Sequence, residues 1–334
     1  MFASPLDGLI TLLLLACSGW LLALLGHWVL ALANWKVVAS NLPLYLMGLY
    51  PAAAYWRPLV LMACLVLLAV LTLLSPRLPR LAVFRWLQRL LPWLWLLALP
   101  LGFWLLSGGL GLDPVRTRQW GGLTLTLVVT AGSALLALPL GVLLALGRRS
   151  PYPLVHHSSS FYVELIRAVP LISVLFFGQL LIPLFLPSGW TIDRVLRAVL
   201  SFAFFAAAYV AEDVRGGLQA LPPTQREAAH ALGLSVVQTV GLVLLPQALR
   251  IALPALTNQL VGLVQNTSLL AILGAVELLG ISRSILANPQ FIGRYLEVYV
   301  WLGVLYWLIC TTMTLIARQL EARLGAGAGS PSSG

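Results

Sequence analysis

Residues 222–246, PPTQREAAHALGLSVVQTVGLVLLP, form an insert with a polar start between two long apolar segments. The two leading prolines should end the preceding helix, because proline lacks the backbone N–H that a helix interior uses. Thr224 and Glu227 have the T-x-x-E spacing of a capping box, and Gly233 can supply the left-handed residue that ends a helix. The sequence therefore predicts a short helix that another molecule can contact.

The rest of the insert predicts a small-residue face and a second cap. The small residues in the middle of the helix are Ala228, Ala229 and Ala231. Ser235 and Gln238 repeat the capping spacing before the chain turns apolar and reaches Pro246. We expect two short capped helices joined at a glycine hinge.

The composition indicates a membrane protein. Hydrophobic residues make up 60% of the 334, and charged residues only 9%, too few to cover the surface of a soluble protein of this size. Crossing a bilayer takes roughly 20 apolar residues. Apolar runs predict an all-α polytopic integral membrane protein with about eight transmembrane helices. The expected spans are 9–32, 58–74, 90–107, 121–146, 169–186, 195–218, 246–278 and 296–317.

The formal charge of +10 comes from 20 basic and 10 acidic residues, and the arginines lie mainly in short loops between spans. Such loops face the cytoplasm by the positive-inside rule, so we do not expect nucleic-acid binding. The strongest basic cluster lies between spans two and three and consists of Arg77, Arg80, Arg85 and Arg89. Placing it in the cytoplasm puts the 222–246 insert and both termini there too. A second set of arginines would then face the opposite side: Arg116, Arg118, Arg194, Arg197, Arg283 and Arg294.

Several catalytic motifs are missing from the sequence. A Walker A loop needs a lysine after its glycine-rich turn, and the only lysine is Lys36, in ANWKVV. The sequence contains neither H-E-x-x-H nor G-x-S-x-G, and its three cysteines lie in apolar runs without metal-like spacing. We expect no enzymatic activity, no metal and no bound cofactor in this chain.

A shift in composition near residue 110 suggests two parts and a tail. Residues 1–110 hold three Leu- and Trp-rich spans and are expected to be an added anchor. Residues 119–320 hold five spans with denser Gly, Pro and polar punctuation, as a working core would. Residues 325–334, GAGAGSPSSG, are expected to be a flexible tail.

The motifs together resemble a known family. Glu227-Ala228-Ala229, Gly233 and the Val243–Pro246 run match the EAA signature of permease subunits of bacterial ATP-binding-cassette (ABC) importers. The flanking segments are similar to the polar-amino-acid branch, in particular to general L-amino-acid and histidine–glutamine permeases. Those segments are WGGLTLTL at 120–127, LGRRS at 146–150, E-x-x-R-x-x-P-L at 164–171, and AYVAE at 208–212 followed by RGG at 215–217.

The resemblance implies a type I importer core of five helices in the bacterial inner membrane, which translocates polar L-amino acids. It implies a second permease subunit, identical or related, two ATPase subunits that bind ATP and Mg²⁺, and a periplasmic amino-acid-binding protein. It also assigns ATPase coupling to a set of insert residues: Thr224, Glu227, Ala228, Ala229, Gly233 and Pro246. The chain departs from the family at Pro223-Thr224, where Lys-Gly is common, and at Gln265-Asn266, where Lys-Asp is common.

Polar groups in the expected spans suggest a translocation path and a gate. Amides at membrane depth should face the bundle interior or a water-filled path, although hydrogen bonding between helices is an equal alternative. The path candidates are Asn258, Gln259, Gln265, Asn266 and Thr267. Glu164 with Arg167, and Glu212 with Arg215, are three residues apart on helices, so each pair is either self-satisfied or part of a cytoplasmic gate.

Two other classes of function are open at this point. An ion-coupled secondary transporter of small polar solutes would need acidic groups in the membrane, and the candidates are Glu164, Glu212 and Glu277. A membrane scaffold without transport activity is the third class.

Overall fold

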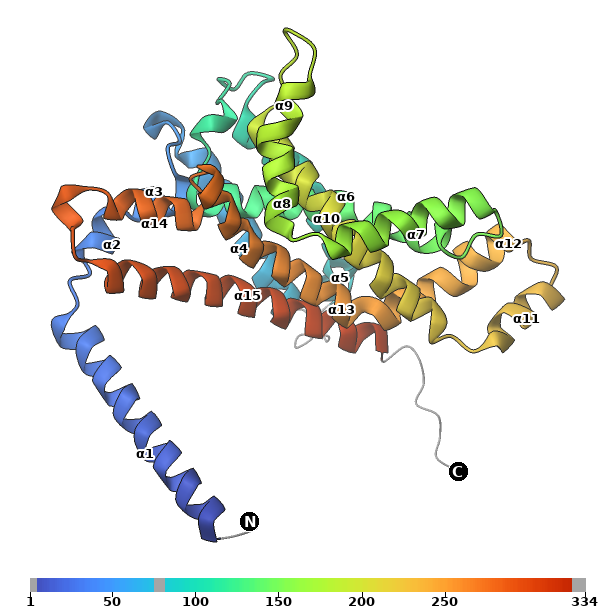
Figure 1. Ribbon diagram of the computed structural model, residues 1–334, viewed down its shortest axis with the longest axis horizontal. Coiled ribbons are helices and arrows are strands. Elements are labelled where there is room, and N and C mark those ends of the chain that lie inside the picture. Colours follow the sequence, from blue (N-terminus) through green and yellow to red (C-terminus); the bar gives the residue numbers. More distant parts are fainter. Residues whose placement is uncertain (1–4, 75–81, 326–334) are drawn as a thin grey trace.

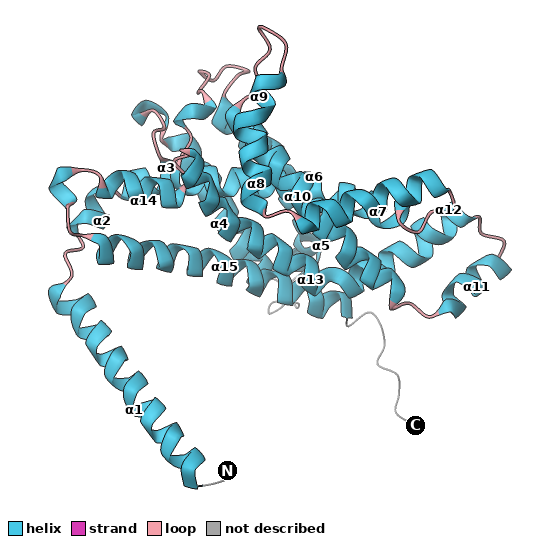
Figure 2. Ribbon diagram, viewed as in Figure 1, coloured by secondary structure: helices cyan, strands magenta, loops and turns pink. Residues whose placement is uncertain are grey.

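The computed structural model describes residues 5–74 and 82–325 (Figure 1). Within these ranges the chain is helical, with no strand beyond two isolated bridges (Figure 2). The α-helices are α1 (Pro5–His27), α2 (Lys36–Ser40), α3 (Leu42–Met47), α4 (Trp56–Leu74), α5 (Ala82–Ser107), α6 (Gly122–Gly147), α7 (Pro153–Ala168), α8 (Leu171–Phe176), α9 (Ile182–Phe185), α10 (Arg194–Gln219), α11 (Pro223–Ala231), α12 (Val236–Gln238), α13 (Leu245–Asn266), α14 (Leu278–Leu286) and α15 (Tyr295–Gly325).

Seven stretches of the described chain are long and apolar enough to cross a membrane, or eight if one bent helix pair counts as a span. They are Leu6–Leu32, Ala52–Leu74, Arg89–Ser107, Gly122–Gly147, Arg194–Gln219, Val236–Leu273 and Tyr295–Ala322. The all-α polytopic fold with about eight membrane helices is thereby confirmed.

The expected fifth span, residues 169–186, differs from the prediction. It consists of α8, a π-helical segment Phe177–Leu181 and α9, and it qualifies as a span only together with α7, from which it is bent by 104°. Val169 breaks the helix: its ψ of 135° is extended, as expected for the residue before a proline, here Pro170. α7 therefore counts toward a span only as one half of this bent pair.

α10 is the central helix of the bundle. In its best 18-residue window 61% of the residues are buried, against at most 28% in any other span. It packs between α6 and α13 through glycines: Gly141 of α6 faces Val210, and Gly217 of α10 faces the backbone of Ala248 on α13. Small residues allow this close approach of membrane helices.

The region before residue 110 shares hydrophobic clusters with the region after it. Met47 and Leu106 pack with Trp120 and Phe202 in one cluster, and the buried Tyr50 hydroxyl donates a 2.7 Å hydrogen bond to the Leu106 carbonyl. α1, by contrast, has none of its span window buried and extends away from the bundle (Figure 1). The division into an anchor and a core stays a prediction from composition.

The two ends of the bundle carry different elements. α11 lies at one end, beyond the ends of α10 and α13, while α2, α3 and α14 lie at the other (Figure 1). Of the basic cluster used for orientation, Arg77 and Arg80 lie outside the described residues, as does the tail at 326–334. The orientation of the termini stays a prediction.

Candidate functional site

α11 begins with a proline instead of a capping box. Pro222 is the N-cap, with extended backbone (φ −60°, ψ 140°) and no side-chain cap, and Pro223 occupies the first turn. Proline suits that position, because it lacks an N–H that would have no partner there and its φ is already helical. The helix therefore starts one residue before Thr224, whose hydroxyl lies inside the first turn. The predicted capping box of Thr224 and Glu227 is wrong.

The end of α11 is a complete Schellman motif around Gly233. The Gly233 N–H donates to the His230 carbonyl at 2.9 Å, and the Leu234 N–H donates to the Ala229 carbonyl at 3.1 Å. Gly233 has φ +76°, the left-handed conformation that this motif needs. The predicted glycine stop is confirmed.

α11 is exposed along nearly its whole length. Ala229 is its one buried residue, 3% exposed, while Ala228 and Ala231 lie on the solvent side. The predicted single face of three alanines is therefore wrong, because residues 228 and 229 are a hundred degrees apart around a helix. No hydrogen bond or ion pair of the described residues uses the Glu227 side chain, so this carboxylate is available to a partner.

The second cap is confirmed, but it opens a long helix. The Gln238 N–H donates to Ser235 Oγ at 3.3 Å, and the Ser235 N–H donates to Gln238 Oε1 at 2.9 Å. From there α12, a π-helical segment Thr239–Leu244 and α13 run on without a break. The wider π turn lies directly before Pro246, the second residue of α13. Proline has no backbone N–H, so it would leave a gap in the regular series of α-helical hydrogen bonds. The expected second short helix is therefore the start of the next span.

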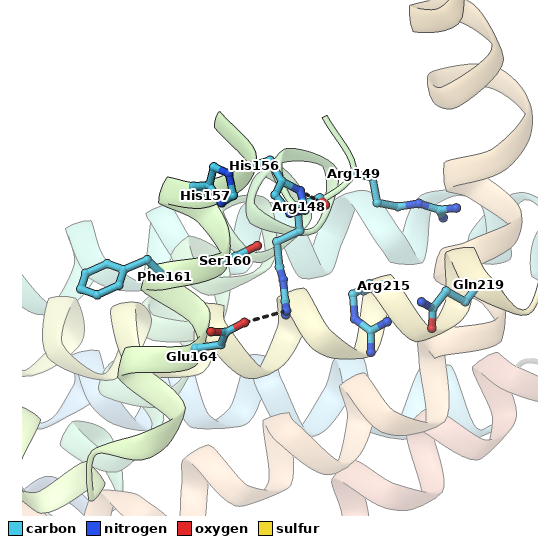
Figure 3. A pocket seen from close by; sticks show the side chains of 9 residues that line it. All are labelled: Arg148, Arg149, His156, His157, Ser160, Phe161, Glu164, Arg215 and Gln219. Atoms are coloured by element: carbon cyan, nitrogen blue, oxygen red, sulfur yellow. Dashed lines mark hydrogen bonds and ion pairs between the residues drawn. The ribbon is translucent and has the colours of Figure 1, made fainter. Parts of the chain in front are cut away.

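Charged side chains from α7, α10 and the end of α6 meet in one cluster. Arg148, directly after α6, places Nη1 2.6 Å from Glu212 Oε2 on α10 and Nη2 3.4 Å from Glu164 Oε1 on α7 (Figure 3). Glu212 Oε2 also lies 3.5 Å from Arg167 Nη1, and Glu212 Oε1 accepts a 2.9 Å hydrogen bond from Arg215 Nε. We call these five residues the charged cluster.

The charged cluster revises one predicted pair and confirms the other. Glu212 pairs with Arg215 as expected. In the described structure Glu164 pairs with Arg148, and Arg167 pairs with Glu212, so Glu164 and Arg167 are not a self-satisfied pair. Arg148 comes from another helix, and no spacing along the sequence reveals such a contact.

The polar residues of the seventh expected span do not share one environment. Asn258 and Gln265 are exposed, Gln259 and Asn266 are half-buried. Thr267 is 1% exposed and donates back to the Val264 carbonyl at 2.6 Å. α13 ends at Asn266 and a 3₁₀ segment follows, so Thr267 does not continue the α-helix that carries the other four path candidates.

Two acidic side chains, Asp213 and Glu277, lie outside the charged cluster. Asp213, next to Glu212 on α10, was not singled out in the sequence; its buried Oδ2 has no hydrogen-bond partner among the described residues, and Gln259 of α13 lies nearby. Glu277 is fully buried and caps α14, where it accepts hydrogen bonds from the N–H groups of Leu279 (2.8 Å) and Gly280 (2.9 Å). Burial raises the pKa of Glu277 above its ordinary value. Glu277 is therefore a structural cap in a turn between spans.

Known proteins resemble most of this chain. Residues 137–326 match the family described as "Binding-protein-dependent transport system inner membrane component". The inner membrane amino-acid ABC transporter permease protein YhdY of Escherichia coli K12 is 39% identical over 295 residues, covering 88% of this chain and 79% of the relative. The glutamate/glutamine/aspartate/asparagine transport system permease protein BztC of Rhodobacter capsulatus is 38% identical, covering 83% and 66%.

A solved structure agrees with these relatives. A crystal structure of an amino acid ABC transporter with histidines contains a chain that is 29% identical, with a TM-score of 0.54, and the match covers 60% of this chain and 92% of that one. The family model covers α11 and the whole charged cluster. The chain thus belongs to the family of inner-membrane components of binding-protein-dependent transport systems.

Proposed function

We propose that this chain is the permease subunit of an ATP-driven importer of polar L-amino acids in a bacterial inner membrane. The observation that carries the proposal is α11, an exposed and rigidly terminated helix between two packed membrane helices. The names of the relatives, which include amino-acid permeases, support the substrate class.

The energy for import would come from partners. The chain has one lysine, Lys36, and no Walker A loop around it, so ATP and Mg²⁺ would bind to two separate ATPase subunits. A second permease subunit would complete the pore, and a periplasmic binding protein would deliver the amino acid. This chain would catalyse no bond chemistry itself.

α11 is suited to transmit motion of an ATPase. Its last turn is fixed by the Schellman hydrogen bonds, and Ser235 caps the continuous helix that follows. α10 and α13, on either side of it, touch through Gly217 and Ala248. A displacement of α11 would therefore move both membrane helices together, with Thr224, Glu227 and Ala228 on the outer surface that the ATPase contacts.

The charged cluster would be the cytoplasmic gate. Its ion pairs join the ends of α6, α7 and α10, and the Glu212 carboxylate alone serves three arginines. Sliding of α10 against α6 would exchange these partners, which is the kind of two-state contact that a gate needs. Amides on α13, in particular Asn258 and Gln265, would line the substrate path, with Gln259 near Asp213 of α10.

Reconstitution in proteoliposomes tests the proposal against ion coupling. We expect uptake of a radiolabelled polar amino acid to require the ATPase, ATP and the binding protein, and to be unaffected when ionophores dissipate ion gradients. Uptake by this chain alone, driven by a proton or sodium gradient, would instead support the secondary transporter. Its acidic candidates are weak, because Glu164 has a 70% exposed side chain, Glu212 is ion-paired and Glu277 is a helix cap.

A further inference from the structure

A pocket extends from the charged cluster, with which it shares Arg148, Glu164 and Arg215, to residues that the proposed function does not use. It has a volume of about 650 Å³. It opens between the end of α6, the part of α7 from His156 to Glu164 and the last turns of α10 (Figure 3). Nine residues line it: Arg148, Arg149, His156, His157, Ser160, Phe161, Glu164, Arg215 and Gln219.

The pocket has an excess of positive charge that no carboxylate of the described residues balances. Arg148 and Arg215 have carboxylate partners in the charged cluster. Arg149 has no ion pair among the described residues, and its side chain extends along the opposite wall from Glu164 (Figure 3). Burial lowers the pKa of Arg149, and the nearby positive charges of Arg226 and Arg215 lower it further. An anion between these arginines would remove that repulsion.

The two histidines supply further polar groups on the same wall. His156 Nδ1 lies 2.7 Å from the Arg148 carbonyl oxygen. Because that oxygen can only accept, Nδ1 carries the proton and donates to it, which orients the His156 ring. The His157 ring packs edge-on against His156 with centroids 5.3 Å apart, so both rings border the pocket.

An apolar stripe on α7 leads directly into the pocket. Leu154, Phe161 and Leu165 recur at i, i+7 and i+11 on one face of the helix and are 80%, 67% and 47% exposed. Phe161 belongs to both the stripe and the pocket lining. An anionic site bordered by exposed apolar side chains matches a molecule with a charged head and an acyl chain.

We propose that this pocket binds the phosphate of an anionic phospholipid, with Arg149 as the principal ligand and the α7 stripe against an acyl chain. Guanidinium groups bind phosphate oxygens through short charge-assisted hydrogen bonds. Basic pockets between membrane helices bind anionic headgroups in the same way. Free phosphate shares the headgroup chemistry but gains nothing from Leu154, Phe161 and Leu165. This proposal does not depend on which solute the protein transports.

Native mass spectrometry of the full-length chain in mild detergent tests the site. Dioleoyl phosphatidylglycerol and dioleoyl phosphatidylcholine are added at equal concentrations to wild type and to Arg149→Gln. We expect wild type to retain phosphatidylglycerol preferentially, and Arg149→Gln to bind it about fivefold more weakly. Arg149→Lys keeps the charge and should retain most of the preference. Arg116→Gln removes one charge in the segment that precedes α6, whereas the pocket lies at the other end of that helix, so this variant should behave as wild type.

The remaining arms distinguish the source of the phosphate. Phe161→Ser should weaken retention of phosphatidylglycerol, and inorganic phosphate at the same concentration should not displace the lipid. Equal lipid binding by Arg149→Gln and wild type would overturn the proposal. Displacement of the lipid by inorganic phosphate would overturn it too. So would the absence of any phosphatidylglycerol preference in the wild type, a result that would favour an acidic protein as the partner of the arginines.

Discussion

Replacing Glu212 by glutamine removes the one carboxylate that three arginines of the charged cluster share. Its Oε2 lies 2.6 Å from Arg148 Nη1 and 3.5 Å from Arg167 Nη1, and its Oε1 accepts from Arg215 Nε at 2.9 Å. The Glu212 side chain is only 23% exposed and that of Arg148 17%. The variant would keep three positive charges close together, with only the exposed Glu164 beside Arg148 as a counter-charge.

The size of the effect follows from the exposure of these groups. Two charges about 4 Å apart interact by about 4 kcal/mol at an effective dielectric constant near 20, and desolvation offsets most of this. Exposed pairs contribute less than about 1 kcal/mol each. With three partly exposed partners, we expect Glu212→Gln to lower the free energy of unfolding by about 2–3 kcal/mol.

Thermal unfolding of the purified protein, followed by tryptophan fluorescence, measures this loss. Glu164→Gln is the matched control, because its side chain is 70% exposed and has one partner, Arg148, at 3.4 Å. The control should change stability by less than about 0.5 kcal/mol. High salt should reduce the difference in Tm between Glu212→Gln and wild type, because screening weakens the ion pairs of the wild type. An unchanged Tm for Glu212→Gln, or an equal loss in both variants, would show that Glu212 does not hold the three arginines together.

Three further substitutions test other parts of the structure, each by thermal unfolding. Gly233→Ala should lower the free energy of unfolding by about 1 kcal/mol, because φ at this residue is +76°. Gly241→Ala is the control: its added methyl group also meets open space, but the residue has no positive φ, so stability should not fall. Equal effects of the two substitutions would contradict the Schellman motif. Gly217→Ala would push a methyl group into the Ala248 carbonyl and should cost roughly 1–3 kcal/mol, so a neutral result would argue against the close α10–α13 contact. The raised pKa of Glu277 means that its contribution to stability is present below its ordinary pKa of 4.5 and is lost as pH rises through the raised value. Glu277→Gln should therefore flatten this part of the Tm profile between pH 4 and 8, and an unchanged profile would count against the burial of the carboxylate.

The sequence predicted the features that depend on residues near each other in the chain. Spans followed from runs of apolar residues, the stop at Gly233 from the need for a left-handed residue, and the Ser235 cap from its partner three residues later. The predicted Thr224 cap is absent because the sequence holds two competing signals for the start of the helix. Pro223 is as good a first-turn residue as Thr224 is a cap, and the proline set the start of α11.

Features that depend on contacts between helices could not be predicted in this way. Arg148 joins Glu164 and Glu212 only because α6, α7 and α10 end side by side. The bend after α7 had a local signal in Pro170, but its angle depends on packing. That Ala228 and Ala229 point in different directions follows from helix geometry alone, but which of them packs inward depends on contacts between helices.

Site-specific cross-linking from α11 shows whether this helix docks on the ATPase subunit. In a variant in which Cys17, Cys64 and Cys310 are replaced, a single cysteine is placed at the exposed Ala228 or, as a control, at the exposed Gln290 in the segment after α14. We expect position 228 to cross-link to the ATPase subunit, with a yield that changes when ATP is added. Position 290 should give no such product. Equal cross-linking from both positions, or none from position 228 in a complex that still imports amino acids with ATP, would contradict this docking.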